Sequence, residues 1–369
     1  MIRVRRGIEA VPAYGVGRLG SAEDPANQGF VQLISNESPF APLPSVSDAI
    51  SRAAAGANRY PDFDGVVLRA RLAEVHGVEA EQIVLGCGSI EVCHQAAAIA
   101  AGPESEVLHA WPTFPEYTTV AALSGARVRR VPLTQERHDV DAMADAVSEQ
   151  TRIVFVCNPN NPTGTALTEA EVAHLLDKIP STCLVVVDEA YAEFADAPEF
   201  GSALNLLGAH ENLLVLRTFS KAYGLAGLRV GYGITSAEVA SLLRLAKIPF
   251  SVGSVALAAA IASLDAGDEL AARIASVKAE RDRVATRLTG RGWKIPPSQA
   301  NFLWIAADED RAAAAVRRCA ESKVLVRRFP DGVRITVGAE EENTRLLDAL
   351  GSPDGLPPTG VAAASLAGR

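Results

Sequence analysis

The sequence predicts an α/β protein whose main layer is a mostly parallel β-sheet covered by helices. Short β-branched runs alternate with alanine- and leucine-rich segments of helix length, which is the pattern of successive β–α–β units. Runs such as CLVVVD (183–188) are apolar throughout, as expected for strands covered on both faces. The predicted strands are Gln82–Leu85, Glu106–His109, Arg127–Val131, Arg152–Val156, Leu184–Asp188, Leu213–Arg217 and Arg229–Gly233.

Helix starts can also be recognised between these strands. The segment from Thr168 to Lys178 opens with Thr168-x-x-Glu171, a capping box in which two side chains satisfy two backbone amides of the first turn. Ser89 opens a second helical stretch, which continues to Ala101. These signals support strand–helix alternation in the first two thirds of the chain.

The chain is long enough for two lobes. Its 369 residues, 48% of them hydrophobic, exceed the size of one ordinary core. After Val255 an alanine-rich, charged helical stretch spans 256–290, followed by strand candidates at Asn301–Ile305, Val324–Arg327 and Val333–Val337. We predict an N-terminal arm with part of the small domain (1–45), a large domain (46–255), a small α+β domain (256–350) and a disordered tail (351–369).

Composition restricts the possible partners. A formal charge of −9 argues against a nucleic-acid surface and against a polybasic membrane patch. No apolar run reaches the length of a bilayer span, and the N-terminus has no apolar core typical of a signal peptide. The five cysteines show no CxxC pair and no metal-ligand spacing with histidine. We therefore expect a cytoplasmic protein without a metal site, a nucleic-acid partner or a membrane partner.

Four polar segments end or follow strand candidates. They are GCGSIE (86–91), NPNNPTG (158–164), DEAY (188–191) and TFSKAYGLAGLRVG (218–231). In parallel sheets, ligands bind at the carboxyl ends of the strands. A single ligand bound at this edge of the sheet would contact all four segments.

Lys221 is the candidate nucleophile. Burial and neighbouring cations lower the pKa of a lysine, so that its amine can attack an aldehyde near neutral pH. Ser220 and Arg229 could bind a phosphate through charge-assisted hydrogen bonds. The alternative is a solvated surface lysine, which the apolar neighbours Phe219 and Tyr223 make a poorer interpretation.

Asp188 ends a buried strand, where a carboxylate needs a cationic or hydrogen-bonding partner. A protonated pyridine nitrogen is such a partner and keeps the ring an electron sink. The alternatives for Asp188 are a metal ligand or a helix N-cap. Tyr191 and Asn161 could bind a ring oxygen, although a packing aromatic and an ordinary loop residue are the simpler interpretations of each.

Two further features complete the predicted binding site. Gly86 and Gly88 allow close backbone approach, and the amides at the start of the helix at Ser89 can bind phosphate. Phe114 could stack on a flat ring, with a place in the core as its alternative. A phosphate, a pyridine nitrogen, a phenolic oxygen and an aldehyde occur together in pyridoxal 5′-phosphate (PLP). The sequence therefore predicts a PLP enzyme.

With these motifs the chain resembles the fold-type I PLP aminotransferases, in the histidinol-phosphate aminotransferase branch. It is most similar there to the actinobacterial aromatic amino acid (phenylalanine) aminotransferases. The resemblance implies the aspartate aminotransferase-like fold, with a large PLP-binding domain built on a seven-stranded sheet, a smaller α+β domain, and a homodimer. The segments that carry it are LISNESPFAPLPSV (33–46), NRYPD (58–62), VCNPNNPTG (156–164), VVDEAY (186–191), RTFSKAYGLAGLRVGY (217–232), PPSQANF (296–302) and VRITVG (333–338).

The resemblance also implies roles for individual residues. Lys221 carries PLP as a Schiff base and moves the proton during transamination, and Asp188 pairs with the ring nitrogen. Tyr191 and Asn161 bind the phenolic oxygen, and Phe114 stacks on the ring in place of the tyrosine common in the family. The phosphate contacts are Ser89, Ile90, Thr218, Ser220 and Arg229, together with Tyr60 of the partner subunit; the substrate contacts are Asn36, Tyr14, Arg327 and Arg334.

One motif departs from the branch, which often has GSDE where this chain has Gly88-Ser89-Ile90-Glu91. The implied phosphate contact uses backbone amides, so we expect little loss of cofactor binding. The aromatic-specific members similarly have an aliphatic residue after GCGS.

The resemblance implies ping-pong transfer of an amino group between an aromatic amino acid and a 2-oxo acid, with glutamate and 2-oxoglutarate as the second pair. Histidinol-phosphate aminotransferase is the main alternative, because Arg334, Arg327 and Tyr14 could also meet a phosphate. A PLP-dependent decarboxylase of the same fold is a further alternative. A PLP-binding regulator is disfavoured by the acidic chain, and a nucleotide enzyme by the lack of a P-loop or a GxGxxG after an early strand.

Overall fold

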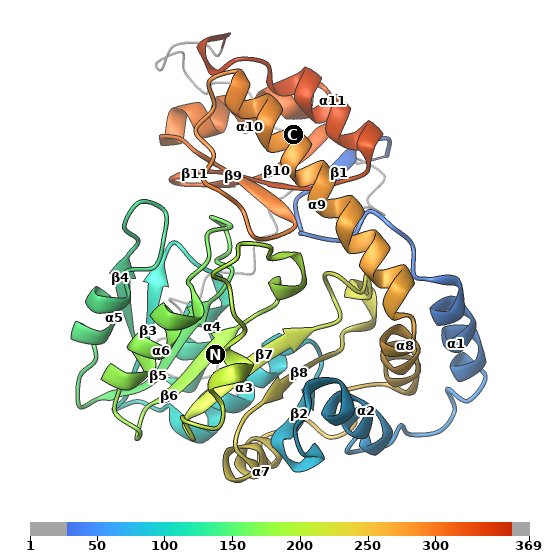
Figure 1. Cartoon of the computed structure of the whole chain (residues 1–369), viewed down its shortest axis with the longest axis vertical. Helices are drawn as coiled ribbons and strands as arrows, with labels where there is room; N and C mark the ends of the chain where they lie inside the picture. Colours follow the sequence, from blue (N-terminus) through green and yellow to red (C-terminus); the bar gives the residue numbers. More distant parts are fainter. Residues whose placement is uncertain (1–27, 356–369) are drawn as a thin grey trace, which may run out of the picture.

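A mostly parallel sheet forms the centre of the larger lobe in the computed structural model, which describes residues 28–355 (Figure 1). Within these residues the sheet has seven strands, in the order β2 (Ile83–Gly86), β8 (Gly231–Ile234), β7 (Leu213–Thr218), β6 (Leu184–Asp188), β5 (Thr151–Cys157), β3 (Glu106–Trp111) and β4 (Arg127–Pro132). β8 runs antiparallel to both neighbours, and the other pairs are parallel. The predicted α/β class with a mostly parallel seven-stranded sheet is confirmed.

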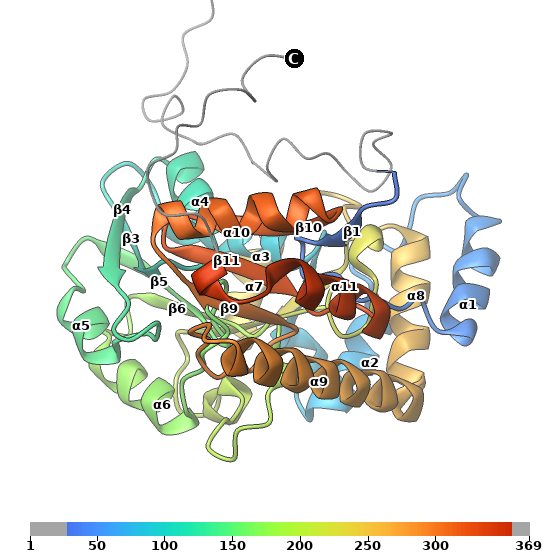
Figure 2. The same cartoon turned by 90° about the horizontal axis from the view of Figure 1, so that it is seen from above.

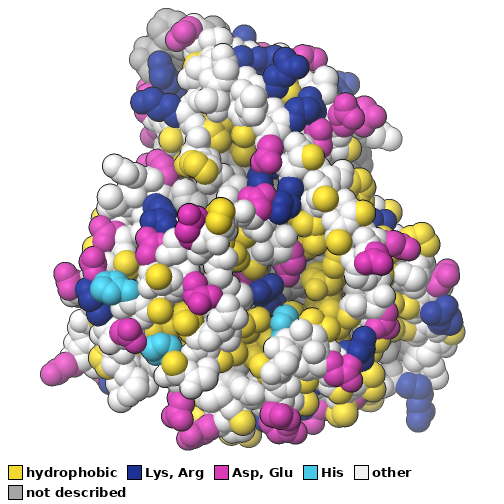
Figure 3. Space-filling model, viewed as in Figure 1, with side chains coloured by type: hydrophobic (Ala, Val, Ile, Leu, Met, Phe, Trp, Pro, Cys, Tyr) yellow, Lys and Arg dark blue, Asp and Glu magenta, His cyan; other side chains and the backbone are white. Residues whose placement is uncertain are grey.

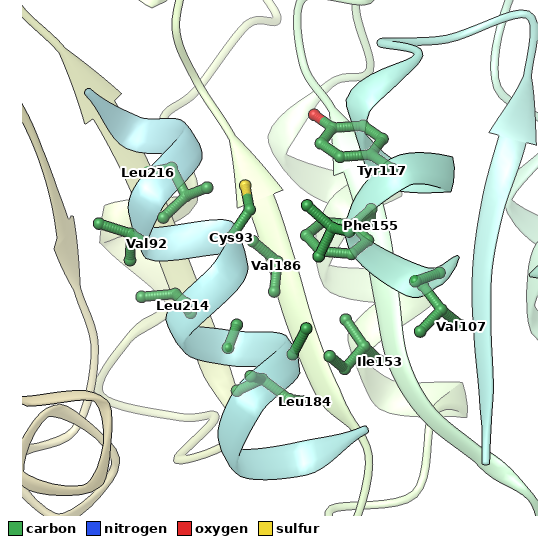
Figure 4. Packing of buried hydrophobic residues seen from close by; sticks show 14 of the residues in the cluster. Val92, Cys93, Val107, Tyr117, Ile153, Phe155, Leu184, Val186, Leu214 and Leu216 are labelled. Atoms are coloured by element: carbon green, nitrogen blue, oxygen red, sulfur yellow. The ribbon is translucent and has the colours of Figure 1, made fainter. Parts of the chain in front are cut away.

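Helices cover both faces of this sheet. They are α2 (Val66–His76), α3 (Ser89–Ala100), α4 (Glu116–Ser124), α5 (Val140–Asp145), α6 (Glu169–Lys178) and α7 (Ala237–Leu245). Alternate side chains of the central strands point to opposite faces. Phe155 and Val186 therefore pack with residues of α3 and α4 (Figure 4), whereas Val185 and Val187 pack with residues of α6. This double burial explains why the central strands β5 and β6 are largely apolar.

The capping box predicted at the start of α6 is present. The hydroxyl of Thr168 accepts a hydrogen bond from the Glu171 amide at 3.1 Å, and the Glu171 carboxylate accepts one from the Thr168 amide at 2.7 Å. The same carboxylate forms an ion pair with Arg137, and together these contacts lower the Glu171 pKa to about 2 against the opposing effect of burial. The local signal in the sequence was therefore sufficient to locate this helix start.

A four-stranded sheet forms the smaller lobe within the described residues. Its order is β1 (Val31–Leu33), β10 (Val324–Phe329), β11 (Gly332–Thr336) and β9 (Phe302–Ala306). α10 (Glu309–Glu321) and α11 (Glu340–Leu350) pack with this sheet around one core (Figure 2). β1 pairs in parallel with β10, although the two strands are nearly 300 residues apart in the sequence. The N-terminal residues of β1 therefore belong to the sheet of the small lobe.

Two helices connect the lobes. α8 (Ser254–Asp265) packs against α1 (Pro44–Ala54) beside the large lobe, and α9 (Gly267–Gly290) extends from there to the small lobe (Figure 1). The helical stretch predicted over 256–290 is thus divided at Ala266. Residues 1–27 and 356–369, including Tyr14 and most of the predicted tail, lie outside the described residues.

The strand predicted over Arg229–Gly233 begins later than expected. Arg229 has φ 56°, in the left-handed region, so it cannot continue a strand, and β8 starts at Gly231. This turn directs the Arg229 side chain toward the start of α3. Its Nη2 lies so close to Gly88, the N-cap residue of α3, that a Cβ added to Gly88 would be only 2.5 Å away. The backbone departure therefore positions a predicted site residue.

The surface carries charges of both signs. On the face drawn in Figure 3, Lys and Arg side chains are interspersed with Asp and Glu side chains. Within residues 28–355 no helix is both long enough and apolar enough to cross a bilayer.

Candidate active site

A cavity of about 440 Å³ lies where the carboxyl ends of β5, β6 and β7 meet the start of α3 and residues of the small lobe. Its volume is in the range of small-molecule sites. Thirteen of the fifteen predicted site residues line it: Asn36, Ser89, Ile90, Phe114, Asn161, Asp188, Tyr191, Thr218, Ser220, Lys221, Arg229, Arg327 and Arg334. The exceptions are Tyr14, which is not described, and Tyr60.

Lys221 lies in this cavity and is half-buried, so it is not a solvated surface lysine. Its Nζ donates a hydrogen bond to the Ser35 carbonyl at 2.9 Å. Burial, with the positive charges of Arg334 and Arg229, lowers the pKa of Lys221 to about 7, although Glu37 and Asp188 oppose the shift. A substantial fraction of this amine is therefore unprotonated at neutral pH, as a nucleophile or base requires.

Asp188 ends β6 with its side chain 3% exposed. Its Oδ2 accepts a hydrogen bond from the Tyr117 hydroxyl at 2.8 Å, and its Oδ1 accepts one from the Ala190 amide at 3.2 Å. Burial raises the pKa of Asp188 to about 6, against the lowering effect of these hydrogen bonds. A cation brought to this carboxylate would stabilise its charged form.

The two alternatives for Asp188 find no support in the structure. Asp188 caps no helix in the described part of the chain, since the short helix after it has Tyr191 as its N-cap residue. Among residues 28–355, no three His, Cys, Asp or Glu side chains are grouped so that they could hold a metal ion.

The start of α3 and Arg229 form an anion site at one end of the cavity. Arg229 Nη1 donates to the Ser220 hydroxyl at 3.2 Å. A Cβ on Gly231 would lie 2.3 Å from the Ser89 amide nitrogen, so only glycine lets β8 approach the first turn of α3 this closely. Amides at a helix start, a guanidinium and a hydroxyl are a suitable donor set for a phosphate.

A further part of the cavity wall contains two polar pairs. Asn36 Nδ2 donates to the Tyr191 hydroxyl at 3.0 Å, and Arg334 Nη1 donates to Asn161 Oδ1 at 2.6 Å. Arg334 is 4% exposed, and it enters from β11 of the small lobe. Residues from both lobes thus meet at this wall.

Three site residues were missed by the sequence analysis. Tyr117 reaches Asp188 from α4, but a buried tyrosine inside a helix resembles any core residue in the sequence. Glu37 and Glu116 also line the cavity, where Glu37 acts electrostatically on Lys221 and Arg327 acts on Glu116. Glu37 follows the predicted Asn36 and Glu116 begins the helix after Phe114, but no sequence pattern distinguishes either glutamate from a surface residue.

Tyr60 does not line the cavity of its own chain. It is 83% exposed and stacks on Phe250, with the ring centres 4.7 Å apart. Tyr60 therefore takes no part in the cavity of its own chain.

The cavity fits PLP on the chemistry of its donors. It has an anion site for a phosphate, a buried carboxylate for a ring nitrogen, hydroxyl and amide groups for a ring oxygen, and an amine of lowered pKa for the aldehyde. Phe114 supplies an aromatic wall. These groups come from segments that are distant in the sequence.

Known proteins with similar sequences and structures agree with this assignment. A family model described as aminotransferase class I and II matches residues 28–350. An aromatic amino acid aminotransferase of Streptomyces coelicolor is 46% identical over 343 residues, covering 92% of this chain and 94% of the relative. Another, of Rhodococcus jostii, is 46% identical over 347 residues, with 94% of each covered.

Solved structures extend the comparison. Histidinol-phosphate aminotransferase of Sinorhizobium meliloti, in complex with pyridoxal-5′-phosphate, has a TM-score of 0.83 at 29% identity, covering 88% of this chain and 90% of that one. Aspartate aminotransferase of Thermotoga maritima, with a TM-score of 0.83 at 22% identity, covers 95% and 99% and shows the fold. The chain belongs to the class I and II aminotransferases, enzymes that depend on PLP.

Proposed function

We propose that this enzyme moves an amino group between an aromatic amino acid and a 2-oxo acid, with glutamate and 2-oxoglutarate as the second pair. The observation that carries the proposal is the set of relatives at 42–46% identity over more than nine tenths of the chain, whose names state aromatic amino acid aminotransferase. The cavity agrees with it, because Ile90, Phe114 and Pro115 give it an apolar side next to its charged groups.

Each side chain of the site has a proposed task in this reaction. PLP, when bound, supplies the electron sink that accepts the negative charge from the substrate. Lys221 would hold the cofactor through its amine, and once a substrate amine has taken its place on the cofactor, the free Lys221 amine would take the proton from the substrate Cα. Asp188 would stabilise a positive charge on the ring nitrogen, and Tyr191 with Asn161 would bind the ring oxygen.

The remaining residues hold the cofactor and the substrate in place. The phosphate would be held by the Ser89 and Ile90 amides, Thr218, Ser220 and Arg229, and Phe114 would pack against the ring. Arg334 binds the substrate carboxylate as a bidentate fork, and Asn36 lies beside the substrate. The position of Arg334 supports this role. Arg334 is buried, and its positive charge lowers the pKa of the Lys221 amine in the same cavity.

Histidinol phosphate is the second candidate substrate. The solved histidinol-phosphate aminotransferase of Sinorhizobium meliloti matches with a TM-score of 0.83, and Arg327 with Arg334 could bind a phosphate. The sequence relatives favour the first candidate. Those named aromatic amino acid aminotransferase are 42–46% identical, whereas the histidinol-phosphate aminotransferase of Sinorhizobium meliloti is 29% identical. We therefore favour the aromatic substrate.

Steady-state rates test the proposal. With 2-oxoglutarate as acceptor, we expect kcat/KM for phenylalanine or tyrosine to exceed that for histidinol phosphate by at least about 10-fold, which corresponds to ~1.4 kcal/mol in transition-state stabilisation. A higher kcat/KM with histidinol phosphate would show that the aromatic assignment is wrong. Release of CO₂ from the amino acid in place of a 2-oxo acid product would identify a decarboxylase.

We also propose that the enzyme is a homodimer in which Tyr60 completes the partner's phosphate site. An exposed apolar patch formed by Tyr60, Phe63 and Phe250, with the exposed Ile248 two residues before Phe250 in the sequence, supports this arrangement. Phe250 contacts both other rings, with centroid distances of 4.7 Å to Tyr60 and 5.4 Å to Phe63. Contiguous exposed apolar groups of this kind mark association surfaces.

We further propose that the enzyme is located in the reducing cytoplasm. Its five free thiols support this location.

Sedimentation velocity tests the dimer. Ile248 is 62% exposed, and we expect Ile248→Glu to shift the wild-type dimer toward monomer, because an interface would bury the new charge. Leu123→Glu, at an exposed leucine of α4 outside the patch, is the matched control and should remain dimeric. A dimer of unchanged stability in Ile248→Glu would exclude this patch as the interface.

A further inference from the structure

Tyr117 contacts the active site from behind its wall. It is completely buried, and its side chain does not line the cavity. Its hydroxyl donates to Asp188 Oδ2 at 2.8 Å, and its ring stacks on Phe155 with a centroid distance of 4.4 Å and an interplanar angle of 4°. Figure 4 shows Tyr117 beside Phe155 within this core cluster. The parallel stacking restricts the position of the hydroxyl.

The same ring also supports the aromatic wall of the cavity. Phe114 meets Tyr117 edge to face, at a centroid distance of 5.4 Å and an angle of 86°. Phe114 lines the cavity, as Asp188 does. One buried side chain therefore contacts both the carboxylate and the aromatic residue assigned to the cofactor ring.

We propose that Tyr117 is a positioning residue, which holds the Asp188 carboxylate charged and oriented toward the cofactor's ring nitrogen. This inference rests on the proposed role of Asp188. A buried carboxylate needs hydrogen-bond donors to remain ionised. Within residues 28–355, Tyr117 is the side chain that donates to it, and the Ala190 amide is the backbone donor.

The other groups around Asp188 do not replace this hydrogen bond. Burial raises the pKa values of the Cys93 and Cys157 thiols, so both remain neutral at ordinary pH. Burial raises the pKa of the Tyr117 hydroxyl as well, so it keeps the proton that it donates. The titratable groups facing the carboxylate are Tyr117 of α4, Cys93 of α3, Cys157 at the end of β5, and Glu189, Tyr191 and Lys221.

The substitution Tyr117→Phe removes the hydroxyl and keeps the ring packing against Phe155 and Phe114. We expect the dissociation constant of PLP from the Tyr117→Phe protein to rise about 10-fold, since the lost hydrogen bond is made to a charged acceptor. The pH below which PLP affinity declines should also move upward, because Asp188 without this donor stays protonated to a higher pH.

Tyr232→Phe is the matched control. Tyr232 is 1% exposed, its hydroxyl lies 2.8 Å from His76 Nε2, and it does not line the cavity. Tyr232→Phe removes a buried hydroxyl of the same kind. Because this hydroxyl does not line the cavity, the substitution should leave both PLP affinity and its pH profile at wild-type values. A purely structural role of Tyr117 would change the thermal unfolding midpoint without moving that profile.

The outcomes separate this inference from the proposed site. If Tyr117→Phe binds PLP with the wild-type constant and pH profile while Asp188→Asn binds it more weakly, Tyr117 has no positioning role and the site stands. If Asp188→Asn also binds PLP as tightly as the wild type, the role of Asp188 fails and the inference fails with it.

Discussion

Lys221→Ala is expected to lower the transamination rate by about 10⁴-fold, because it removes both the covalent attachment of the cofactor and the base that acts on the substrate Cα. The amine lies in the cavity with its pKa lowered to about 7, so no other described lysine combines this location with this readiness to lose a proton. Single-turnover and steady-state rates with phenylalanine would measure the loss.

Two controls make the Lys221 result specific. Lys178→Ala removes a lysine from an exposed ion pair with Asp141 on the surface and should leave the rate unchanged. Borohydride should attach the cofactor permanently to the peptide that contains Lys221 in the wild-type protein, but not in the variant. Normal transamination by Lys221→Ala would contradict the whole mechanism.

The lowered pKa of Lys221 also sets a pH dependence. Attack on the aldehyde needs the unprotonated amine, so the rate of covalent PLP attachment should rise with pH up to about 7 and become level above it. If the lysine had an ordinary pKa of about 10.4, the rate of PLP attachment would keep rising with pH well beyond 7. Stopped-flow absorbance of the apoprotein mixed with PLP would separate the two profiles.

Asp188→Asn is expected to lower kcat by about 10²- to 10³-fold while Lys221 still attaches PLP. The amide has the shape of the carboxylate and can still accept the Tyr117 hydrogen bond, but it carries no charge to stabilise a positive ring nitrogen. Electrostatic stabilisation in a water-poor site is strong, and Asp188 is only 3% exposed. The loss should therefore appear in the chemical step more than in substrate binding.

Asp308→Asn provides the matched control for this change. Asp308 caps α10 in the small lobe by accepting a hydrogen bond from the Arg311 amide at 2.9 Å, and asparagine caps helices equally well. Its kcat should match the wild type. An Asp188→Asn enzyme with an undiminished kcat would exclude the proposed partnership between this carboxylate and the ring.

Much of the fold, and most of the residues that line the cavity, could be predicted from the sequence. The strand ending in Asp188 and the segment around Lys221 could be recognised because apolar runs that stop at a charged residue need only local information. The same holds for the start of α6, where Thr168 and Glu171 complete their hydrogen bonds within one turn.

The tertiary structure decided the features that depend on partners far along the chain. β1 has three residues, too few to show a period, and is a strand because it pairs with β10. The turn of Arg229 into the left-handed region was likewise hidden, because it depends on the packing of β8 against the start of α3.

The supporting contacts of the site belong to the same category. In the sequence Tyr117 cannot be distinguished from an ordinary core residue. Only the packing of α4 places its hydroxyl 2.8 Å from Asp188 Oδ2. Local patterns determined which elements form and which carry reactive groups, since those depend on neighbours in the sequence. Only three-dimensional packing determined which side chains surround and tune these groups, since it brings together segments that share no local signal.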